Sequence, residues 1–200
     1  MTLVPNLEAY PKTVLLADGT KIVLRPPEPA DRLRLLRLFS RLPEVERYYL
    51  RDDVTAPELI GSWTGRLDLE AVVPILALEG DDVIGDASLH RSRAKSRRHV
   101  GEIRVVVAPE YRYRGLGHRL IAELLEISAD LDLEKVTFEL AAQGEEPAIQ
   151  VATSMGFQEV ARYVRGVKDL WGNYQDLVVL EAAIPRSEAG SLGASKKGNV

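Results

Sequence analysis

Hydrophobic and polar positions along this 200-residue chain follow two periods, one typical of strands and one typical of helices. Apolar or β-branched runs bounded by turn residues predict strands, whereas apolar residues three and four positions apart predict helices. The strand pattern covers residues 14–16, 21–24, 73–78, 83–89, 100–107, 135–140, 159–166 and 176–183. The helical pattern covers residues 30–42, 44–50, 55–69, 115–125 and 147–155, with Thr55 as the expected N-cap of the third helix.

These elements predict a single α+β domain over residues 13–184, with a mixed, mostly antiparallel sheet and no second core. Asp18-Gly19 and residues 79–82 are turn sequences, each between two predicted strands. Residues 1–12 are interpreted as an N-terminal arm. Residues 185–200, which contain almost no large apolar side chain, are interpreted as a disordered tail. In the first helix, the apolar face is expected to consist of Leu35, Leu36, Phe39 and Leu42.

Composition narrows the possible functions. The net charge of −4 and a pI near 5.5 argue against a nucleic-acid-binding protein. No apolar run approaches the length that spans a bilayer, and the N-terminus lacks the features of a signal peptide, so we expect a cytoplasmic protein with no membrane partner. The chain has no cysteine, so any acyl transfer must be direct, without a thioester on the protein. His90, His99 and His118 show no spacing typical of metal ligands, and we expect no metal site.

Residues 105–118 carry the strongest chemical indication. A β-branched strand ends at Pro109, and Gly115 and Gly117 follow where a helix must begin. A helix N-terminus presents unpaired N–H groups to an anion, and Arg112 and Arg114 add positive charge. A Walker loop would need Gly-Lys-Ser/Thr, and a dinucleotide loop would need a third glycine; both are absent. A pyrophosphate site and an ordinary strand–loop–helix turn remain as the two interpretations.

The spacing Arg112-x-x-Gly115-x-Gly117 after a strand resembles the acyl-CoA pyrophosphate loop of the GNAT superfamily of N-acyltransferases. Residues 22–31 resemble that family's first strand and helix entry, and Met155-Gly156-Phe157 resembles a segment of its second half. Residues 39–51 are similar to bacterial protein-lysine acetyltransferase domains. The resemblance implies helices on both faces of the sheet and acetyl-CoA as the acyl donor. It also implies that the pantetheine pairs with the main chain at Val105 and Val107. The pyrophosphate would bind the loop and first helical turn at Arg112, Arg114, Gly115, Leu116, Gly117 and His118.

The implied activity is acetyl transfer to a primary amine: a protein lysine, an N-terminus or a small amine. Such transfer benefits from a base, and Glu102 lies where the family commonly places a catalytic glutamate. Strand alternation puts Glu102 and Arg104 on one face of the sheet, so an ordinary ion pair between them is the alternative. The family often supplies a tyrosine as proton donor at the position that Ala152 occupies here; Tyr163 is a second candidate.

Two other functions remain open: a non-catalytic acyl-CoA sensor and an interaction domain. A basic cluster at residues 91–99 is interpreted as an exposed, solubilising hairpin, with an acidic partner surface or the 3′-phosphate of CoA as alternatives. The sequence leaves open the acceptor, the preferred acyl chain and the oligomeric state, a homodimer included.

Overall fold

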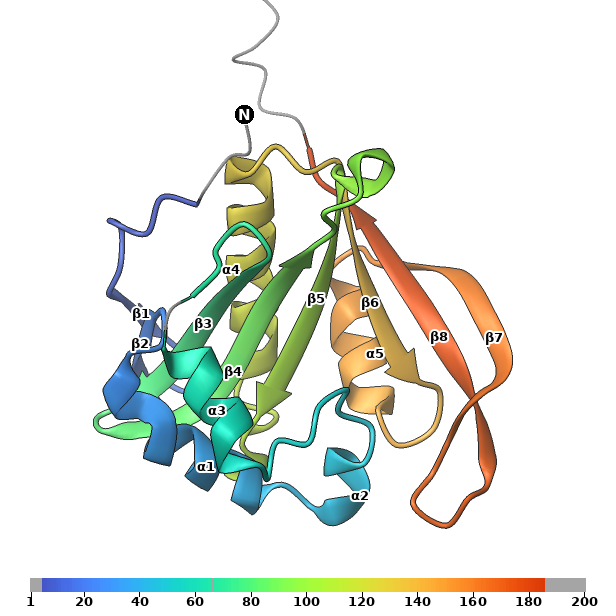
Figure 1. The fold of residues 1–200 in the computed structure, drawn as a ribbon, viewed down its shortest axis with the longest axis horizontal. Coiled ribbons are helices and arrows are strands. Elements are labelled where there is room, and N and C mark those ends of the chain that lie inside the picture. Colours follow the sequence, from blue (N-terminus) through green and yellow to red (C-terminus); the bar gives the residue numbers. More distant parts are fainter. Residues whose placement is uncertain (1–4, 66, 186–200) are drawn as a thin grey trace, which may run out of the picture.

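The computed structural model describes residues 5–65 and 67–185. The predicted disordered tail lies outside the described residues except at its first position, as do residues 1–4 of the predicted arm. The described strands form one eight-stranded sheet in the order β1-β2-β3-β4-β5-β6-β8-β7 (Figure 1). They are β1 (Lys12–Leu15), β2 (Lys21–Arg25), β3 (Val72–Glu79), β4 (Asp82–Arg91), β5 (Val100–Val107), β6 (Lys135–Ala141), β7 (Gln158–Lys168) and β8 (Tyr174–Ala183). Every neighbouring pair is antiparallel except β5 and β6, which confirms the predicted mixed, mostly antiparallel sheet.

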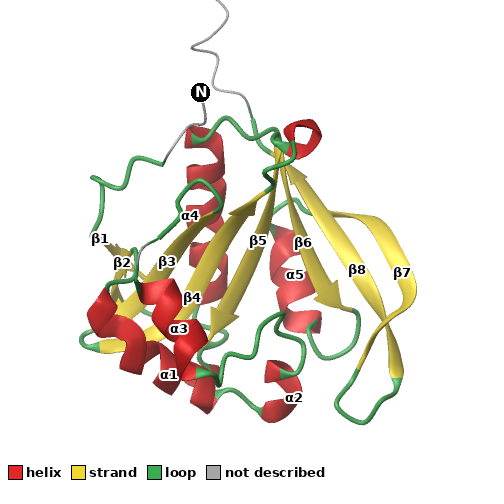
Figure 2. Cartoon of the chain, viewed as in Figure 1, coloured by secondary structure: helices red, strands yellow, loops and turns green. Residues whose placement is uncertain are grey.

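Helices cover both faces of this sheet, as predicted (Figure 2). In the view of Figure 1, α1 and α3 lie in front of the sheet, and α4 and α5 lie behind it. The described helices are α1 (Arg32–Arg41), α2 (Glu44–Arg47), α3 (Pro57–Thr64), α4 (Leu116–Asp130) and α5 (Glu146–Ser154). Within the described residues, no helix combines the length and the apolar character that crossing a membrane requires.

Two apolar clusters form the core, one on each face of the sheet, which corrects the expectation of a single core. The larger cluster packs the sheet against α4 and α5 and includes Leu120 and Phe157. The smaller cluster packs it against α1 and α3 and includes Phe39 and Ile60. Consecutive strand residues point to opposite faces, so a strand covered by helices on both sides feeds both clusters.

Helix boundaries differ most from the predictions between residues 44 and 69. The second helix is a single turn, α2, and the third extends only over Pro57–Thr64. The assignment of Thr55 as N-cap is wrong, because the Thr55 amide and hydroxyl both donate to Asp53 Oδ1 and form a local turn. Helix α3 begins at Pro57, which has no N–H to satisfy and a backbone angle suited to a first turn. In α1, Leu38 is fully buried and Leu36 only partly, the reverse of the expected pattern.

The two parallel strands β5 and β6 pair over only three residues of each strand and then diverge. Their register runs from Val100 opposite Lys135 to Glu102 opposite Thr137, and β5 continues beyond it to Val107. Over that remaining length, β5 is paired with β4 on one side only. The divergence therefore opens the sheet next to the last five residues of β5.

Helix α5 ends at Ser154, one residue before the predicted end, and Gly156 follows its C-cap residue Met155 with a positive φ of 92°. The amide of Gly156 donates to the Thr153 carbonyl and that of Phe157 to the Ala152 carbonyl, which is the Schellman arrangement. This end fixes the rotation of the helix. The Ala152 side chain faces the larger core cluster and is fully buried, with 0% exposure.

We expect Ala152→Tyr to destabilise the fold, because a phenol ring has no space inside that cluster. Overpacking of this kind costs about 1–3 kcal/mol. Urea unfolding should show the loss, and the matched variant Thr153→Tyr, on the exposed side of the same helix, should stay near the parent. Equal stability of the two variants would contradict the orientation of α5.

Candidate functional site

The loop between β5 and α4, residues 108–115, is called the glycine loop here. It contains one 3₁₀ turn, Pro109–Tyr111, and ends at Gly115, whose φ of 87° lies in the left-handed region that glycine tolerates. Helix α4 starts at Leu116, so its first amides have no carbonyl one turn earlier to accept them. The predicted strand–loop–helix is therefore present, with an anion-competent helix start at the diverging end of β5.

A groove of about 330 Å³ runs from the glycine loop along the open side of β5. Its walls come from β5, β6, α4, α5 and the segment around α2. Of the residues predicted to bind the cofactor, six line this groove: Val105, Val107, Arg112, Gly115, Gly117 and His118. Lining residues that the sequence analysis did not single out include Ile121, Phe138, Glu145, Ala148 and Val151.

Two of the predicted residues do not direct their side chains into the groove. The Arg114 guanidinium donates to Asp18 at 2.5 Å and to Thr20 at 2.7 Å, and it stacks on the Tyr111 ring at 4.9 Å. Leu116 is 1% exposed and belongs to the larger core cluster. The expectation that the Arg114 side chain adds charge to the anion site is corrected accordingly; main-chain amides are what these two positions offer.

Three residues with charged or titratable side chains, Glu46, Arg112 and Glu145, line the groove. Arg112 makes a bidentate ion pair with Glu46 of α2, at 2.8 and 2.5 Å, and both residues line the groove. Glu145 accepts the Ala141 amide at 2.6 Å. Burial raises the pKa of Glu145 to about 7, so part of this carboxyl is neutral at neutral pH. An anion bound near Arg112 would compete with Glu46 for the same guanidinium.

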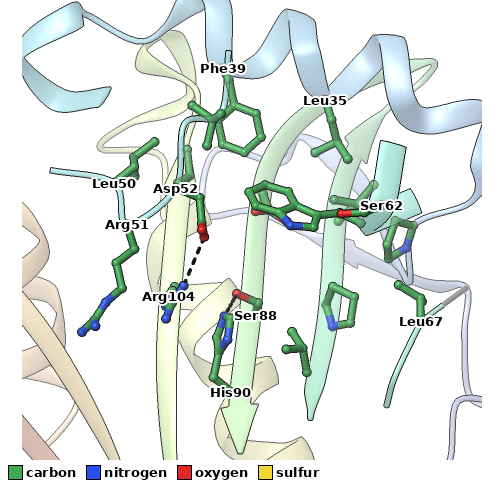
Figure 3. A pocket seen from close by; sticks show the side chains of 18 of the residues that line it. Leu35, Phe39, Leu50, Arg51, Asp52, Ser62, Leu67, Ser88, His90 and Arg104 are labelled. Atoms are coloured by element: carbon green, nitrogen blue, oxygen red, sulfur yellow. Dashed lines mark hydrogen bonds and ion pairs between the residues drawn. The ribbon is translucent and has the colours of Figure 1, made fainter. Parts of the chain in front are cut away.

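A second cavity, about 310 Å³, lies on the other face of β5, beneath α1 and α3; it is called the front pocket here (Figure 3). Its apolar walls include Leu35, Phe39, Leu50, Val54, Trp63 and Leu76. The rings of Phe39 and Trp63 meet edge to face at 6.0 Å. Volume and lining are typical of a site for a small organic group.

The floor of the front pocket changes character along the strands. On β4, Asp86, Ser88 and His90 alternate on the pocket face. In register, Asp86 lies between Leu76 and Val106, whereas Ser88 lies between Pro74 and Arg104. Figure 3 shows the polar end, where Asp52 faces Arg104 at 3.6 Å and Ser88 is hydrogen-bonded to His90 at 2.9 Å. One end of the floor is thus ionic, and the other is apolar around a single carboxyl.

Burial shifts the pKa of both titratable groups of β4 that line the front pocket, Asp86 and His90. The pKa of Asp86 is raised to about 7 by desolvation alone, because its neighbours are apolar. The pKa of His90 is lowered to about 4, first by desolvation and then by the positive charge of Arg104, so the ring is neutral at neutral pH. In the sequence, His90 was considered only as a possible metal ligand and Asp86 was not predicted as a site residue, although polar side chains at every second position of an apolar strand indicate both.

Glu102, predicted as the base, lies on the predicted face of β5 in a salt-bridge cluster. Its Oε1 accepts Arg104 Nε at 3.0 Å and lies 3.2 Å from an Arg51 terminal nitrogen. The ion pair with Arg104 that the alternation allowed is therefore present. Glu102 lines neither of the two cavities described above. No finding tests its catalytic role, which stays a prediction.

Neither expected source of a general acid lies at the groove. Position 152 faces the core, and the residues of α5 that line the groove are Pro147, Ala148, Gln150 and Val151. Tyr163 is 58% exposed on β7, the edge strand of the sheet. Within residues 5–65 and 67–185, no group of three or more His, Cys, Asp or Glu side chains is arranged to hold a metal ion.

The basic cluster at residues 91–99 joins β4 to β5 and includes the 3₁₀ turn Lys95–Arg97. Arg93 pairs with Asp68 on the surface. The basic cluster precedes β5 and the glycine loop follows β5. The eight residues of this strand therefore separate the cluster from the loop by about 26 Å. This position does not support a contact with a phosphate bound at the glycine loop.

Comparison with known proteins adds a family assignment. A model of the acetyltransferase (GNAT) family matches residues 34–157. Among solved structures, the GNAT domain of S. lividans PAT is 20% identical, with a TM-score of 0.68, covering 86% of this chain and 96% of that chain. A putative acetyltransferase from Salmonella typhimurium, solved with its cofactor acetyl-CoA, is 21% identical, with a TM-score of 0.67 and coverages of 84% and 96%.

A third similar structure, ribosomal-protein-alanine N-acetyltransferase from Brucella melitensis, is 22% identical, with a TM-score of 0.69 and coverages of 80% and 98%. At these low sequence identities, the structural similarity is evidence for the fold alone. The three names describe different acceptors or none, so they do not select an acceptor for this chain.

We expect Asp86→Asn to stabilise the protein more at pH 8 than at pH 5. A folded-state pKa near 7, against an ordinary value near 3.8, means that the folded protein holds a proton that the unfolded chain has released. The stability contributed by protonated Asp86 is full below pH 4 and is lost as pH rises through 7. Asparagine removes that loss, which is on the order of 2 kcal/mol after allowance for solvent access from the pocket.

Urea unfolding of parent and variant at both pH values measures this difference. Asp130→Asn, an exposed carboxyl at the end of α4, is the matched control and should show no such trend. A difference between Asp86→Asn and the parent that is the same at pH 5 and pH 8 would contradict the assigned environment.

Proposed function

This chain belongs to the acetyltransferase (GNAT) family and is an acyltransferase, and we propose that it moves an acetyl group from acetyl-CoA directly to a primary amine. The family uses acetyl-CoA as its donor. The absence of cysteine supports direct transfer, because no thiol is present to carry the acyl group. The acceptor amine is a protein lysine, an N-terminus or a small amine.

The observation that carries this proposal is the contact between the two cavities. The groove follows the open side of β5, the front pocket lies on the face of β5 covered by α1 and α3, and Val106 and Leu50 line both. A donor lying in the groove and an acceptor entering the front pocket would meet beside these residues. Transfer between two substrates requires such a meeting point, whereas a sensor that only binds acyl-CoA does not.

The donor is supported by the chemistry of the groove. The main chain of β5 beyond Glu102 has no strand partner on the groove side, so an extended pantetheine with its amides can pair there like an added strand. The pyrophosphate would take the amides at the start of α4, with the Arg112 guanidinium close by. Val105 and Val107 flank the pantetheine, and Gly115 and Gly117 keep side chains out of its path.

The reaction needs few groups from the protein. A neutral amine nitrogen attacks the thioester carbonyl, the new C–N bond forms, and the C–S bond breaks. One ammonium proton must leave the nitrogen before the attack. After the attack, the nitrogen loses a second proton, which goes to the departing sulfur directly or through water. Main-chain N–H groups on the open side of β5 can stabilise the transient oxyanion.

Gly117→Asp tests the cofactor site. A Cβ at position 117 would meet only Val107 Cγ2, at 3.8 Å, so the fold tolerates a side chain there. The new carboxylate would face the pyrophosphate, and we expect acetyl-CoA affinity to fall roughly tenfold or more. Calorimetry measures the affinity, and circular dichroism checks the fold. Ala94→Asp, in the exposed loop before β5, adds the same charge elsewhere and should bind normally. Normal binding by Gly117→Asp would refute this placement of the pyrophosphate.

Glu102→Gln tests the predicted base. If Glu102 removes the ammonium proton, kcat should fall about a hundredfold to ten-thousandfold at pH 7, with acetyl-CoA affinity nearly unchanged. The loss should shrink as pH rises, because more of the acceptor is then already neutral. Steady-state rates between pH 6 and 10 measure this. Full activity of the variant at pH 7 would exclude Glu102 as the base.

A further inference from the structure

Asp86 is a carboxyl without a protein partner at the place where the two cavities meet. Among the described residues, no hydrogen bond or ion pair to its side chain occurs, and it lines the front pocket. Its register partner on β5 is Val106, one of the two residues that line both cavities. Partners in an antiparallel pair have Cα atoms about 4.5–5.5 Å apart, so Asp86 is next to the meeting point.

A carboxyl in such a place is costly unless it is protonated or meets a positive group. The described protein supplies no positive group to it. An amine entering the front pocket would bring one. The ammonium group of such an acceptor would therefore supply the positive charge that the surroundings of Asp86 lack.

We propose that Asp86 binds the ammonium group of the acceptor and takes its proton, and that the acceptor is a primary amine on an apolar alkyl or aryl body. This inference rests on the proposed acetyl transfer. The proton moves from nitrogen to an Asp86 carboxylate oxygen, and the nitrogen lone pair attacks the thioester. After the attack, one of the two remaining N–H protons goes to the departing sulfur and the other stays on the amide nitrogen.

The walls of the front pocket support the apolar part of the acceptor. Asp86 is flanked in register by Leu76 and Val106, and Leu35, Phe39 and Trp63 enclose the same cavity. A hydrocarbon body would bury against these side chains at about 25 cal/mol per Å² of apolar surface. A strongly hydrated body would lose its water there without replacement.

The other charged groups of the pocket lie toward its polar end and largely neutralise one another. Glu102 pairs in register with His90, four residues and about 13 Å along β4 from Asp86. None of these groups contributes to the raised pKa of Asp86, whose cause is desolvation. The titratable and charged groups that line the pocket with Asp86 are His90 of β4, Arg104 of β5, and Arg51, Asp52 and Asp68 of the loops.

The pKa of Asp86, about 7, suits this role, because a base works best when its pKa lies near the working pH. Glu102, in contrast, already accepts from Arg104, lies beside Arg51 and does not line the front pocket. The two carboxyls therefore make different predictions for the same experiment.

The test compares two acceptors of nearly the same shape, phenethylamine and O-benzylhydroxylamine. The first is protonated at pH 7, and the second is neutral. We expect Asp86→Asn to lower kcat/KM for phenethylamine about a hundredfold to ten-thousandfold at pH 7, with the loss shrinking toward pH 10. For O-benzylhydroxylamine, which carries no ammonium proton at pH 7, the variant should stay within about threefold of the parent. Asp130→Asn is the control for an Asp-to-Asn change outside the site.

The outcomes separate the hypotheses. Equal losses with both amines would assign Asp86 a packing role and overturn the inference, as would an unchanged rate with phenethylamine. The inference would also be overturned if the dependence of kcat/KM on amine protonation disappears in Glu102→Gln but persists in Asp86→Asn. That result would favour Glu102 as the base. If the parent transfers the acetyl group but Asp86→Asn shows none of these losses, the inference fails and the proposed function remains supported.

A readout that does not depend on transfer covers the remaining case. If the parent binds acetyl-CoA but acetylates neither amine, the proposed function fails for this acceptor class. The ¹³C carboxyl resonance of Asp86, identified by its loss in Asp86→Asn, then decides the binding part. A saturable shift on addition of phenethylamine supports the contact, and an unmoved resonance overturns it.

Discussion

The short pairing of β5 with β6 is the constraint on which the rest of the site depends. Parallel strands normally satisfy each other's backbone groups along their length, but here three residues pair before the strands part. The main chain of β5 beyond Glu102 is left with one strand partner, β4, and its other side is available for pairing with an extended ligand. The opening also leads to the start of α4, whose first amides are unpaired too. An elongated ligand that ends in an anion can satisfy both.

Strand alternation then gives β5 two different environments. Val105 and Val107 pack toward α4 and the groove, whereas Arg104 and Val106 face the front pocket. Val106 and Leu50 line both cavities, so a ligand in the groove and a ligand in the front pocket can meet beside them. The floor of the front pocket adds direction, because its ion pairs lie at one end and its apolar residues surround Asp86 at the other. The two ends of the pocket floor therefore offer a ligand different environments, one ionic and one apolar.

Local chemistry allowed part of this site to be predicted. The glycine loop was recognisable because a positive φ at a helix start calls for glycine, and its arginine and two glycines have a fixed spacing. The face of Glu102 followed from the period of two. Prediction failed where local rules compete: Thr55 has the residue type of an N-cap, but its hydroxyl turns back to Asp53 and the helix starts at Pro57. The rotation of α5 was not predicted, because its C-terminal turn and core packing determine it.

The sequence by itself determined most of the elements and the anion-competent loop, because each follows from contacts within a few residues of the chain. Tertiary structure decided which charges meet. Arg114 turned to Asp18, Arg112 to Glu46, and Arg51 joined Arg104 at Glu102. It also left Asp86 without a partner between two apolar side chains. These outcomes depend on residues far apart in the chain, and the energy of a charge depends on what surrounds it in space rather than in sequence.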